Sequence, residues 1–169
     1  MSKTHIIAQY LISEYERITR TKFDDSELKL QKLMYFVQKT SLAFTGKPLI
    51  DETFEGWKHG PVLTSLRYYF DDIKPVRDDI KLSEMDRFII ENTICTYGQY
   101  APWKLRELSH EETAWQNARK GLGVDDSGSR ALSIEDIKKD AANIRLYDHQ
   151  YDMYIDEFED VEEEFVSLG

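Results

Sequence analysis

The residues that could take part in chemistry are few in this chain and lie far apart. His59 and His110 are separated by about fifty positions, and the acidic pair Glu111–Glu112 directly follows the second histidine. No pair of histidines or cysteines has the spacing of a zinc site. No Gly-x-Ser-x-Gly segment marks a nucleophilic serine, and the glycines match neither a P-loop nor a dinucleotide-binding fingerprint. We therefore predict that the chain is not an enzyme and has no catalytic residues, metal site or cofactor.

The tryptophans and the one cysteine are the next candidates for a functional role. Exposed tryptophans are frequent energetic centres of protein interfaces, but large aromatic residues in a small domain are more often part of the core. We therefore expect Trp57, Trp103 and Trp115 to be mainly buried. Cys95 lies within the apolar run 88–97, so we expect a buried and unreactive thiol.

Charge is strongly segregated along the sequence. The net charge is −10, and nine of the 32 acidic residues lie between residues 148 and 169, where there is no Lys or Arg. The other 23 acids nearly balance the 22 basic residues. Nucleic-acid binding needs clustered Lys and Arg, so we expect no direct nucleic-acid binding and instead a basic protein partner. No apolar run is long enough for a membrane span or a signal peptide, so we expect a cytoplasmic protein that does not bind membranes.

The elements that position these residues are predicted to be mostly helices. A length of 169 residues suits a single compact multi-helix domain, which we place at residues 1–146, with a short strand or hairpin around residues 48–60. The second helix begins after capping residues at positions 24–26 and ends at Gly46. Periodicity and capping signals predict the other helices over residues 5–17, 62–70, 84–97, 102–108, 113–120 and 134–146.

Several of these helices carry further expectations. Apolar residues from Leu30 to Phe44 define one buried stripe of the second helix. The helix 84–97 is apolar on two adjoining faces, so we expect it to be the most buried one. Pro61 suits the first turn of the helix that follows it. The face of the second helix opposite its stripe is expected to be solvated, and it holds Lys29, Lys32, Phe36 and Lys39.

Residues 147–169 are predicted to form an acidic amphipathic C-terminal helix or tail. Their apolar residues fit one helical stripe, made of Tyr151, Tyr154, Ile155, Phe158, Val161 and Phe165. A disordered acidic tail has no need of such a stripe, so we expect a helix that a partner stabilises. A solubilising extension, or a final helix packed on the domain, is the alternative. The residues expected to contact a partner are Tyr154, Asp156, Phe158, Glu159 and Phe165.

Five segments together give the chain a resemblance to a known family. They are Leu28-Lys-Leu-Gln-Lys-Leu-Met-Tyr-Phe36, Gly46-Lys-Pro-Leu-Ile50, Phe54-Glu-Gly-Trp-Lys-His-Gly-Pro-Val62, Tyr97-Gly98 and Leu108-Ser-His-Glu-Glu-Thr-Ala-Trp-Gln-Asn-Ala-Arg119. In order and spacing they resemble the Panacea-domain family of bacterial antitoxins and phage-associated proteins, over roughly residues 6–139. The chain departs from the family pattern at Ala114, where many relatives have Pro. The segment after Tyr147 lies outside the resemblance.

The resemblance implies a mostly helical neutralising domain that inhibits a cognate toxin by binding it directly. Family members are paired with toxins of unrelated kinds, so the resemblance does not name the target. A domain whose motif holds the fold while variable surfaces carry the contacts can serve many partners. The motif or partner-binding residues that it implies are Lys32, Tyr35, Trp57, His59, Gly60, Pro61, His110, Glu111, Trp115 and Arg119.

The segregated charge suggests how such a domain binds its target. We expect a surface near the loop 57–62, together with the acidic tail, to cover a basic active-site surface of the toxin, because acidic groups speed encounter with such a surface. Two other functions are left open. The chain could be an adaptor that delivers a partner to an ATP-dependent protease, or an acidic phage-encoded inhibitor that mimics nucleic acid.

Overall fold

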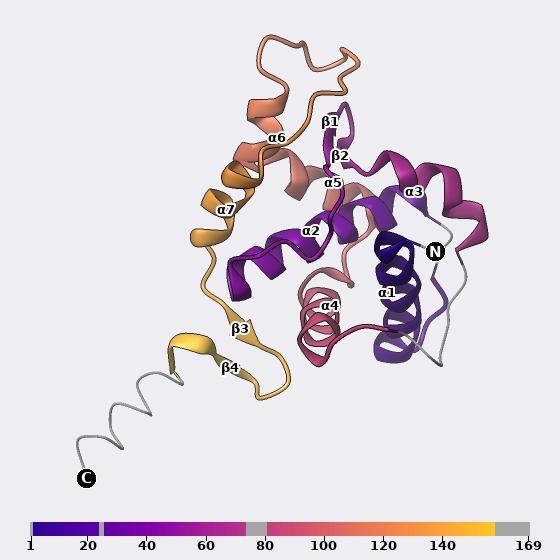
Figure 1. Cartoon of the computed structure of the whole chain (residues 1–169), viewed down its shortest axis with the longest axis vertical. Helices are drawn as coiled ribbons and strands as arrows, with labels where there is room; N and C mark the ends of the chain where they lie inside the picture. Colours follow the sequence, from indigo (N-terminus) through magenta and orange to yellow (C-terminus); the bar gives the residue numbers. More distant parts are fainter. Residues whose placement is uncertain (1, 24–25, 74–80, 158–169) are drawn as a thin grey trace.

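Helix α2 (Glu27–Thr45) crosses the middle of the molecule, and the other elements pack around it (Figure 1). The computed structural model describes residues 2–23, 26–73 and 81–157. Most of the 19 residues of α2 are buried, including all those from Lys29 to Gln38. The Ser26 hydroxyl caps its start by accepting from the Lys29 N–H at 3.1 Å. Gly46 ends it in the left-handed region, with φ of 72°.

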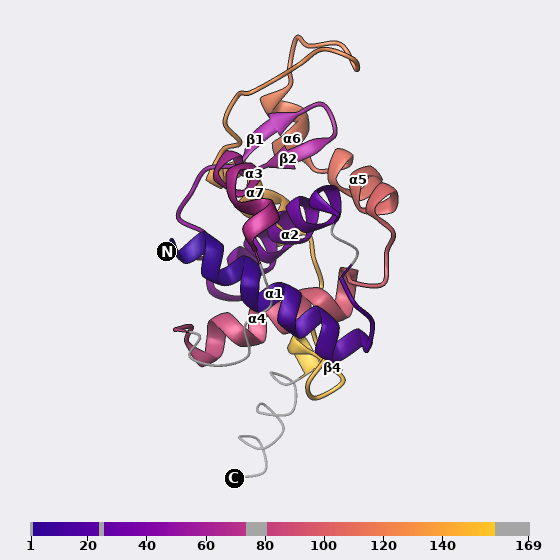
Figure 2. The same ribbon diagram turned by 90° about the vertical axis from the view of Figure 1, so that its right-hand side faces the viewer.

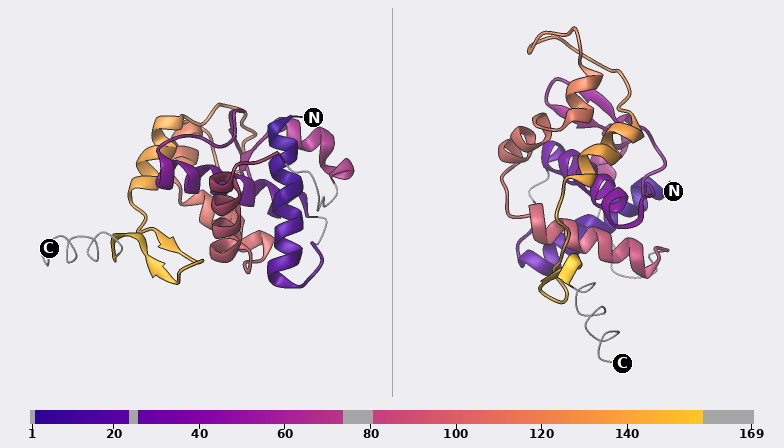
Figure 3. Two further views of the ribbon diagram at one scale, coloured as in Figure 1. Left: turned by 60° about the horizontal axis from the view of Figure 1, so that its bottom comes forward. Right: turned by 90° about the vertical axis from the view of Figure 1, so that its left-hand side faces the viewer.

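Four of the other helices form two pairs, one on each side of α2. Helices α1 (Lys3–Thr19) and α4 (Glu84–Tyr97) pack against each other on one side, and α6 (Thr113–Ala118) and α7 (Ile134–Ala142) on the other (Figures 1 and 3). Helix α5 (Pro102–His110) also packs on α2. Helix α3 (Thr64–Tyr69) continues into a 3-10 turn, η1 (Phe70–Asp72). The mostly helical fold class is therefore confirmed. Within the described ranges, every helix is too short or too polar to cross a membrane.

Two short antiparallel hairpins complete the fold. In the first, β1 (Glu55–Trp57) pairs with β2 (Gly60–Val62), so that Trp57 lies opposite Gly60. The hairpin predicted in this region is confirmed. The chain also returns to β1 later, where the Gly56 N–H donates to the Arg130 carbonyl at 2.8 Å. The helix predicted from residue 62 was wrong at its start, because Pro61 and Val62 belong to β2 and α3 begins at Thr64.

The second hairpin lies at the far end of the molecule from the first (Figures 1 and 2). It pairs β3 (Tyr147–Asp148) with β4 (Met153–Tyr154). The helix predicted to begin at Tyr147 was therefore wrong over these residues. The Asp148 carboxylate accepts from the N–H groups of Gln150 (2.8 Å) and Tyr151 (3.1 Å), which stabilises a turn in place of a helix. The predicted contact residues Phe158, Glu159 and Phe165 lie outside the described residues.

Three expectations about burial were also wrong. The most buried helix is α2 and not α4, because α2 has neighbours on both sides. Cys95 is exposed, since it lies on the outer face of α4. The face of α2 that was expected to be solvated is covered by other elements: Lys29, Lys32 and Phe36 are all buried, and Lys39 is largely covered.

Candidate functional site

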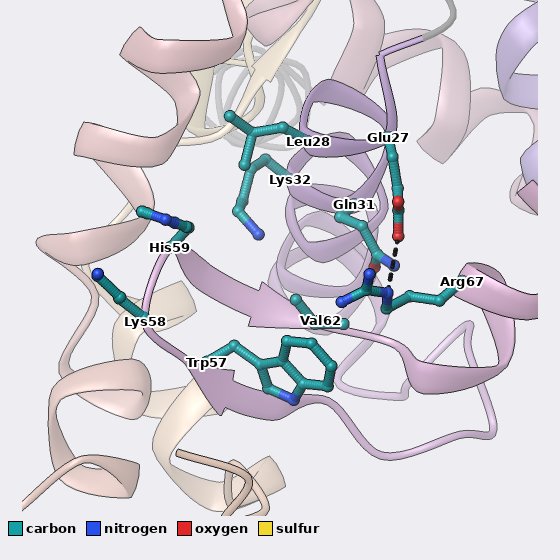
Figure 4. Close-up of a pocket in the computed structure, with 9 residues that line it drawn as sticks. All are labelled: Glu27, Leu28, Gln31, Lys32, Trp57, Lys58, His59, Val62 and Arg67. Atoms are coloured by element: carbon teal, nitrogen blue, oxygen red, sulfur yellow. Dashed lines mark ion pairs between the residues drawn. The ribbon is translucent and has the colours of Figure 1, made fainter. Parts of the chain in front are cut away.

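The first hairpin and the start of α2 enclose a pocket of about 250 Å³. Figure 4 shows the amine of Lys32 and the guanidinium of Arg67 pointing toward the same space from two sides, with Val62 and Trp57 beside it. Lys32 comes from α2, Arg67 from α3 and the other two from the hairpin. The remaining described residues that line the pocket are Glu27, Leu28, Gln31, Lys58 and His59.

The Lys32 side chain connects α2 to the hairpin through a hydrogen bond. It is only 1% exposed, and its amine donates to the Pro61 carbonyl oxygen at 2.7 Å. Burial lowers the pKa of this amine to about 7, against a smaller opposing effect of the Glu27 carboxylate. Within the described residues Lys32 forms no ion pair, so its charge has one hydrogen bond and no direct counter-ion.

Two other polar residues of α2, Gln31 and Gln38, bond to the backbone of the segment 46–63, which connects α2 to α3 and contains the hairpin. The Gln31 amide donates to the Leu63 carbonyl at 3.0 Å and accepts from the Leu63 N–H at 2.9 Å. Two turns later, Gln38 makes the same kind of contact, accepting from the N–H of Ile50 at 2.8 Å and donating to its carbonyl at 3.0 Å. These bonds satisfy backbone groups that would otherwise be buried without partners. The buried polar side of α2 therefore positions the hairpin.

Gly60 allows the hairpin to approach α2 and α5 closely. Its φ is +113°, a conformation that other residues rarely adopt. A Cβ atom at this position would lie 2.5 Å from the Ser109 hydroxyl oxygen and 2.6 Å from the Lys32 Cε. Both the backbone conformation and the lack of space therefore require glycine here.

The second motif segment, 108–119, packs on the first. The Trp115 indole N–H donates to the Trp57 carbonyl at 2.8 Å, and the Trp115 ring stacks on His110 with centroids 3.9 Å apart. Burial, together with nearby cations, lowers the pKa of His110 to about 4, and its Nε2 atom has no hydrogen-bond partner among the described residues. Arg119 is buried and donates to the carbonyl of Gly56 at 3.1 Å and to that of Asp126 at 2.7 Å. The side chains of Trp115 and Arg119 thus support the hairpin from behind.

Two tryptophan–arginine pairs lie on the outer surface of this region. The guanidinium of Arg67 lies 5.0 Å from the centre of the Trp57 ring, and that of Arg106 lies 4.3 Å from the centre of the Trp103 ring. Trp103 is 56% exposed, contrary to the expectation that it would be buried. Arg106 also donates to His59 Nδ1 at 3.0 Å. We call this surface the hairpin face, defined as Trp57, Lys58, His59, Arg67, Trp103 and Arg106.

The structure divides the residues implied by the resemblance into two groups. Trp57 and His59 lie on the hairpin face, and Glu111 is exposed nearby at the end of α5. The others are buried or stacked behind it. Tyr35 is fully buried, with a hydroxyl that has no hydrogen-bond partner among the described residues, and burial raises its pKa. The supporting group comprises Lys32, Tyr35, Gly60, Pro61, His110, Trp115 and Arg119.

The C-terminal residues expected to contact a partner lie elsewhere. The Arg145 guanidinium lies 3.6 Å from the centre of the Tyr154 ring and donates to Asp156 at 2.9 and 3.0 Å. These hydrogen bonds lower the pKa of Asp156. Tyr154 and Asp156 are therefore already engaged within the chain, at the opposite end from the hairpin face (Figure 1).

The sequence did not indicate that Arg67 and Arg106 belong to the hairpin face, and Trp103, a third member, was expected to be buried. No periodicity marks the two arginines, because each belongs to a short helix and meets its tryptophan only through the tertiary fold. Sequence analysis also missed Gln31 and Gln38, although their spacing of two helical turns next to a non-periodic segment is a usable signal. In the part of the chain that the structure describes, no group of three His, Cys, Asp or Glu side chains suits a metal ion.

Comparisons with known proteins point to one family. The family model for the "Antitoxin SocA-like, Panacea domain" matches residues 30–116, just over half of the chain. Antitoxin SocA of Caulobacter vibrioides (strain NA1000 / CB15N) is 51% identical over 37 residues, which are 22% of this chain and 20% of that protein. The match thus spans about a fifth of the curated relative. No solved structure shows significant similarity to the chain. The matched region contains most of α2, the first hairpin and the His110–Trp115 stack, and the chain therefore belongs to the SocA-like Panacea-domain family of antitoxins.

Proposed function

We propose that this protein neutralises a cognate protein toxin by direct binding, with the hairpin face as its main contact surface. Membership of an antitoxin family indicates a non-catalytic regulatory protein with a toxin as partner. The observation that carries the choice of surface is the presence of two tryptophan–arginine pairs on the hairpin face. Tryptophan and arginine are enriched among residues that dominate binding energy at protein interfaces.

The hairpin face also has the rigidity that a binding surface needs. The backbone of Trp57 is held by a supporting residue, because the Trp115 indole N–H donates to the Trp57 carbonyl. A surface that is ordered before binding loses less conformational entropy when the partner docks. The supporting residues Lys32, Tyr35, Gly60, Pro61, His110 and Arg119 act in this proposal by positioning the face, and Glu111 lies at its edge.

We assign residues 147–169 a second role, as an acidic segment that attracts a basic surface of the toxin. The segment carries nine acids and no Lys or Arg. Asp156 is already paired with Arg145, so the charge that steers the encounter comes mainly from the run 159–164. Electrostatic steering of this kind raises the association rate more than it slows dissociation.

Co-expression with the product of the neighbouring open reading frame tests the proposal. Growth should be rescued by the wild-type chain, and the two proteins should purify as a complex. The variants Trp103→Ala and Arg106→Ala should each weaken binding by about 1–3 kcal/mol, whereas the matched surface variant Lys138→Gln should bind as the wild type does. Equal binding by all three variants would rule out the hairpin face as the contact surface.

Truncation before Tyr147 separates the two roles. The truncated chain should bind the same toxin with a slower association rate and a weaker dependence on salt, as measured by surface plasmon resonance. An unchanged association rate removes the acidic segment from the proposal. Loss of the toxin only when an ATP-dependent protease is present would identify an adaptor instead, and strong competition with DNA or RNA for a host enzyme would identify a nucleic-acid mimic.

A further inference from the structure

The pocket beside the hairpin face has a local charge opposite to that of the whole chain. Among the described residues that line it, Lys32, Lys58 and Arg67 are cationic and Glu27 is the one carboxylate. The chain as a whole has a net charge of −10. Burial lowers the pKa of His59, and so do the neighbouring charges of Arg106, Lys58 and Lys32. The described residues that line the pocket therefore carry more positive than negative side chains.

We propose, building on the toxin-binding function above, that this pocket receives one acidic side chain of the toxin, whose carboxylate binds Lys32 and Arg67. The two cations come from separate elements and point toward the same space (Figure 4). Lys32 uses one of its three donors on Pro61. The Arg67 guanidinium pairs with the Glu27 carboxylate through Nε at 3.4 Å, and its other N–H groups can donate to a second carboxylate.

The burial of Lys32 gives an incoming carboxylate a strong reason to bind. A buried ammonium group without a counter-ion carries a desolvation cost that a second charge of opposite sign offsets. Lys32 is 1% exposed and has no ion pair within the described residues. An acidic side chain in the pocket would supply that missing counter-ion.

The size and walls of the pocket favour a side chain over a larger anion. Its volume of about 250 Å³ is below the roughly 300–1,000 Å³ of sites for drug-sized ligands. Leu28, Trp57 and Val62 give it apolar walls, which suit the methylene groups of an acidic residue. A strand of RNA needs a track of cations along its backbone, and a chain with this net negative charge repels a long polyanion.

The pKa of Lys32 supplies a supporting observation. The amine titrates near pH 7 because it is buried, and a bound carboxylate favours its charged form. Affinity for a carboxylate should therefore rise as the pH falls from about 8 to about 6. The charged and titratable groups around it include Glu27 on α2, Arg67 on α3, Arg106 and His110 on α5, and Lys58 and His59 in the hairpin. Lys32→Met distinguishes the contribution of Lys32 from that of His59.

The first experiment needs no toxin. The full chain, labelled with nitrogen-15, is titrated with phenylacetate, with its neutral analogue phenylacetamide and with inorganic phosphate. Phenylacetate should shift the Trp57 indole and Gly60 amide signals saturably, and should bind about fivefold or more tightly than phenylacetamide. Equal binding of the neutral amide, tighter binding of phosphate, or shifts that map to another part of the chain would overturn the proposal.

Matched variants then identify the residues responsible. Arg67→Gln and Lys32→Met should each weaken phenylacetate binding by about fivefold to tenfold, and Arg67→Lys should restore part of it. Lys138→Gln is the control, because Lys138 also pairs with one carboxylate, that of Glu135, on a different surface. Lys32→Met replaces a buried residue and can prevent folding. The Arg67 variants then still test the proposal, because Arg67 is exposed. Unchanged affinity in Arg67→Gln contradicts the proposal.

The second experiment uses the toxin complex. Each surface Asp or Glu of the toxin is replaced in turn by Asn or Gln. One of these toxin variants should bind the wild-type chain about as weakly as the wild-type toxin binds Arg67→Gln. Combining that toxin variant with Arg67→Gln should cause no further loss of affinity. If the wild-type chain binds the toxin and Arg67→Gln binds it equally, the pocket assignment is wrong while the antitoxin function stands. If phenylacetate binds as expected but the wild-type chain binds no toxin, the antitoxin function fails instead. Tighter binding of a single-stranded RNA oligonucleotide, abolished by Arg67→Gln, also overturns the proposal.

Discussion

The two hairpins lie at opposite ends of the molecule and are held in different ways (Figures 1 and 2). The β1–β2 hairpin is attached to α2 by buried side chains, including the Lys32 amine bonded to Pro61. The β3–β4 hairpin is attached to α4 mainly by Asn92, which donates to the Tyr147 carbonyl at 3.1 Å and accepts from the His149 N–H at 3.0 Å. The first hairpin borders a cationic pocket, whereas the second begins the acidic segment.

This difference has consequences for local stability. Opening the β1–β2 hairpin would expose the amine of Lys32 and the amide of Gln31, which are both buried near the start of the core helix. Opening the β3–β4 hairpin breaks a few bonds near the surface and leaves the core in place. Segments with few buried contacts open at low free energy. We therefore expect the β1–β2 hairpin to open at a higher free energy than the β3–β4 hairpin.

The contrast is tested most strongly at Gly60. Gly60→Ala should destabilise the protein by about 2–4 kcal/mol, because the new methyl group would meet Ser109 and Lys32 in a backbone conformation unfavourable for alanine. Urea denaturation measures the change. The control is Gly46→Ala: Gly46 also has a positive φ, but no atom of a distant residue lies within 4 Å of the place that the methyl group would occupy. This variant should cost only about 1 kcal/mol, and equal losses for both would contradict a tightly packed hairpin.

At the other end, Asn92→Ala should release the β3–β4 hairpin while leaving the first one intact. The substitution removes the two hydrogen bonds that Asn92 makes with the hairpin and should cost about 1–2 kcal/mol. Hydrogen exchange measured by mass spectrometry should speed up over residues 147–154 and stay unchanged over residues 55–62. Faster exchange in both hairpins would show that they are not independent. Thr96→Val, which removes one contact with His149, should have a smaller effect.

The buried amine of Lys32 should make stability depend on pH above neutrality. Its folded pKa of about 7 is below the ordinary lysine value of 10.5, so between these values the unfolded chain binds more protons and stability rises with pH. Between about pH 7 and pH 9 the free energy of unfolding should rise by about 2 kcal/mol. Lys32→Met should flatten this rise, and Lys138→Gln should not. A rise of equal size in Lys32→Met would assign the effect to another group.

The last prediction concerns the two histidines near the hairpins. His149 has a partner in the Thr96 hydroxyl at 2.9 Å, whereas His110 Nε2 is buried without one among the described residues. The folded pKa of His110 is lowered to about 4, so stability should fall as the pH drops from about 6.5 to about 4, where the unfolded chain binds more protons.

His110→Phe should remove part of this acid sensitivity. The new ring can keep the stack on Trp115, so stability at pH 7 should stay within about 1 kcal/mol of wild type. Urea denaturation at the two pH values measures both quantities. A variant that loses stability with acid as steeply as the wild type would show that His110 is not the titrating group.

Local signals in the sequence predicted most of the helices, because capping and periodicity involve neighbours along the chain. Ser83 and Ser133 cap α4 and α7 as expected, and Gly46 ends α2. Burial was harder to predict. Lys29 and Lys32 were expected to be solvated, since a lysine on a helix is usually exposed. The structure buries both, because elements distant in sequence supply hydrogen-bond partners such as the Gly98 carbonyl for Lys29, at 2.9 Å.

In the C-terminal segment, the secondary structure itself was predicted wrongly. Its apolar spacing fits a helix, but the Asp148 carboxylate and the left-handed Asp152, with φ of 55°, form a turn. Turn formation by Asp depends on bonds to the backbone that periodicity does not record.

By itself, the sequence determined the family, the helical class, the segregation of charge and the two motif segments that meet at the first hairpin. The tertiary structure alone decided which side of α2 is buried and which cations face a common pocket. It also decided that Trp103 and Arg106 form an exposed pair with a counterpart in Trp57 and Arg67. The reason is physical: capping and periodicity act over a few residues, whereas the burial of a charge and the shape of a surface depend on elements that only folding brings together.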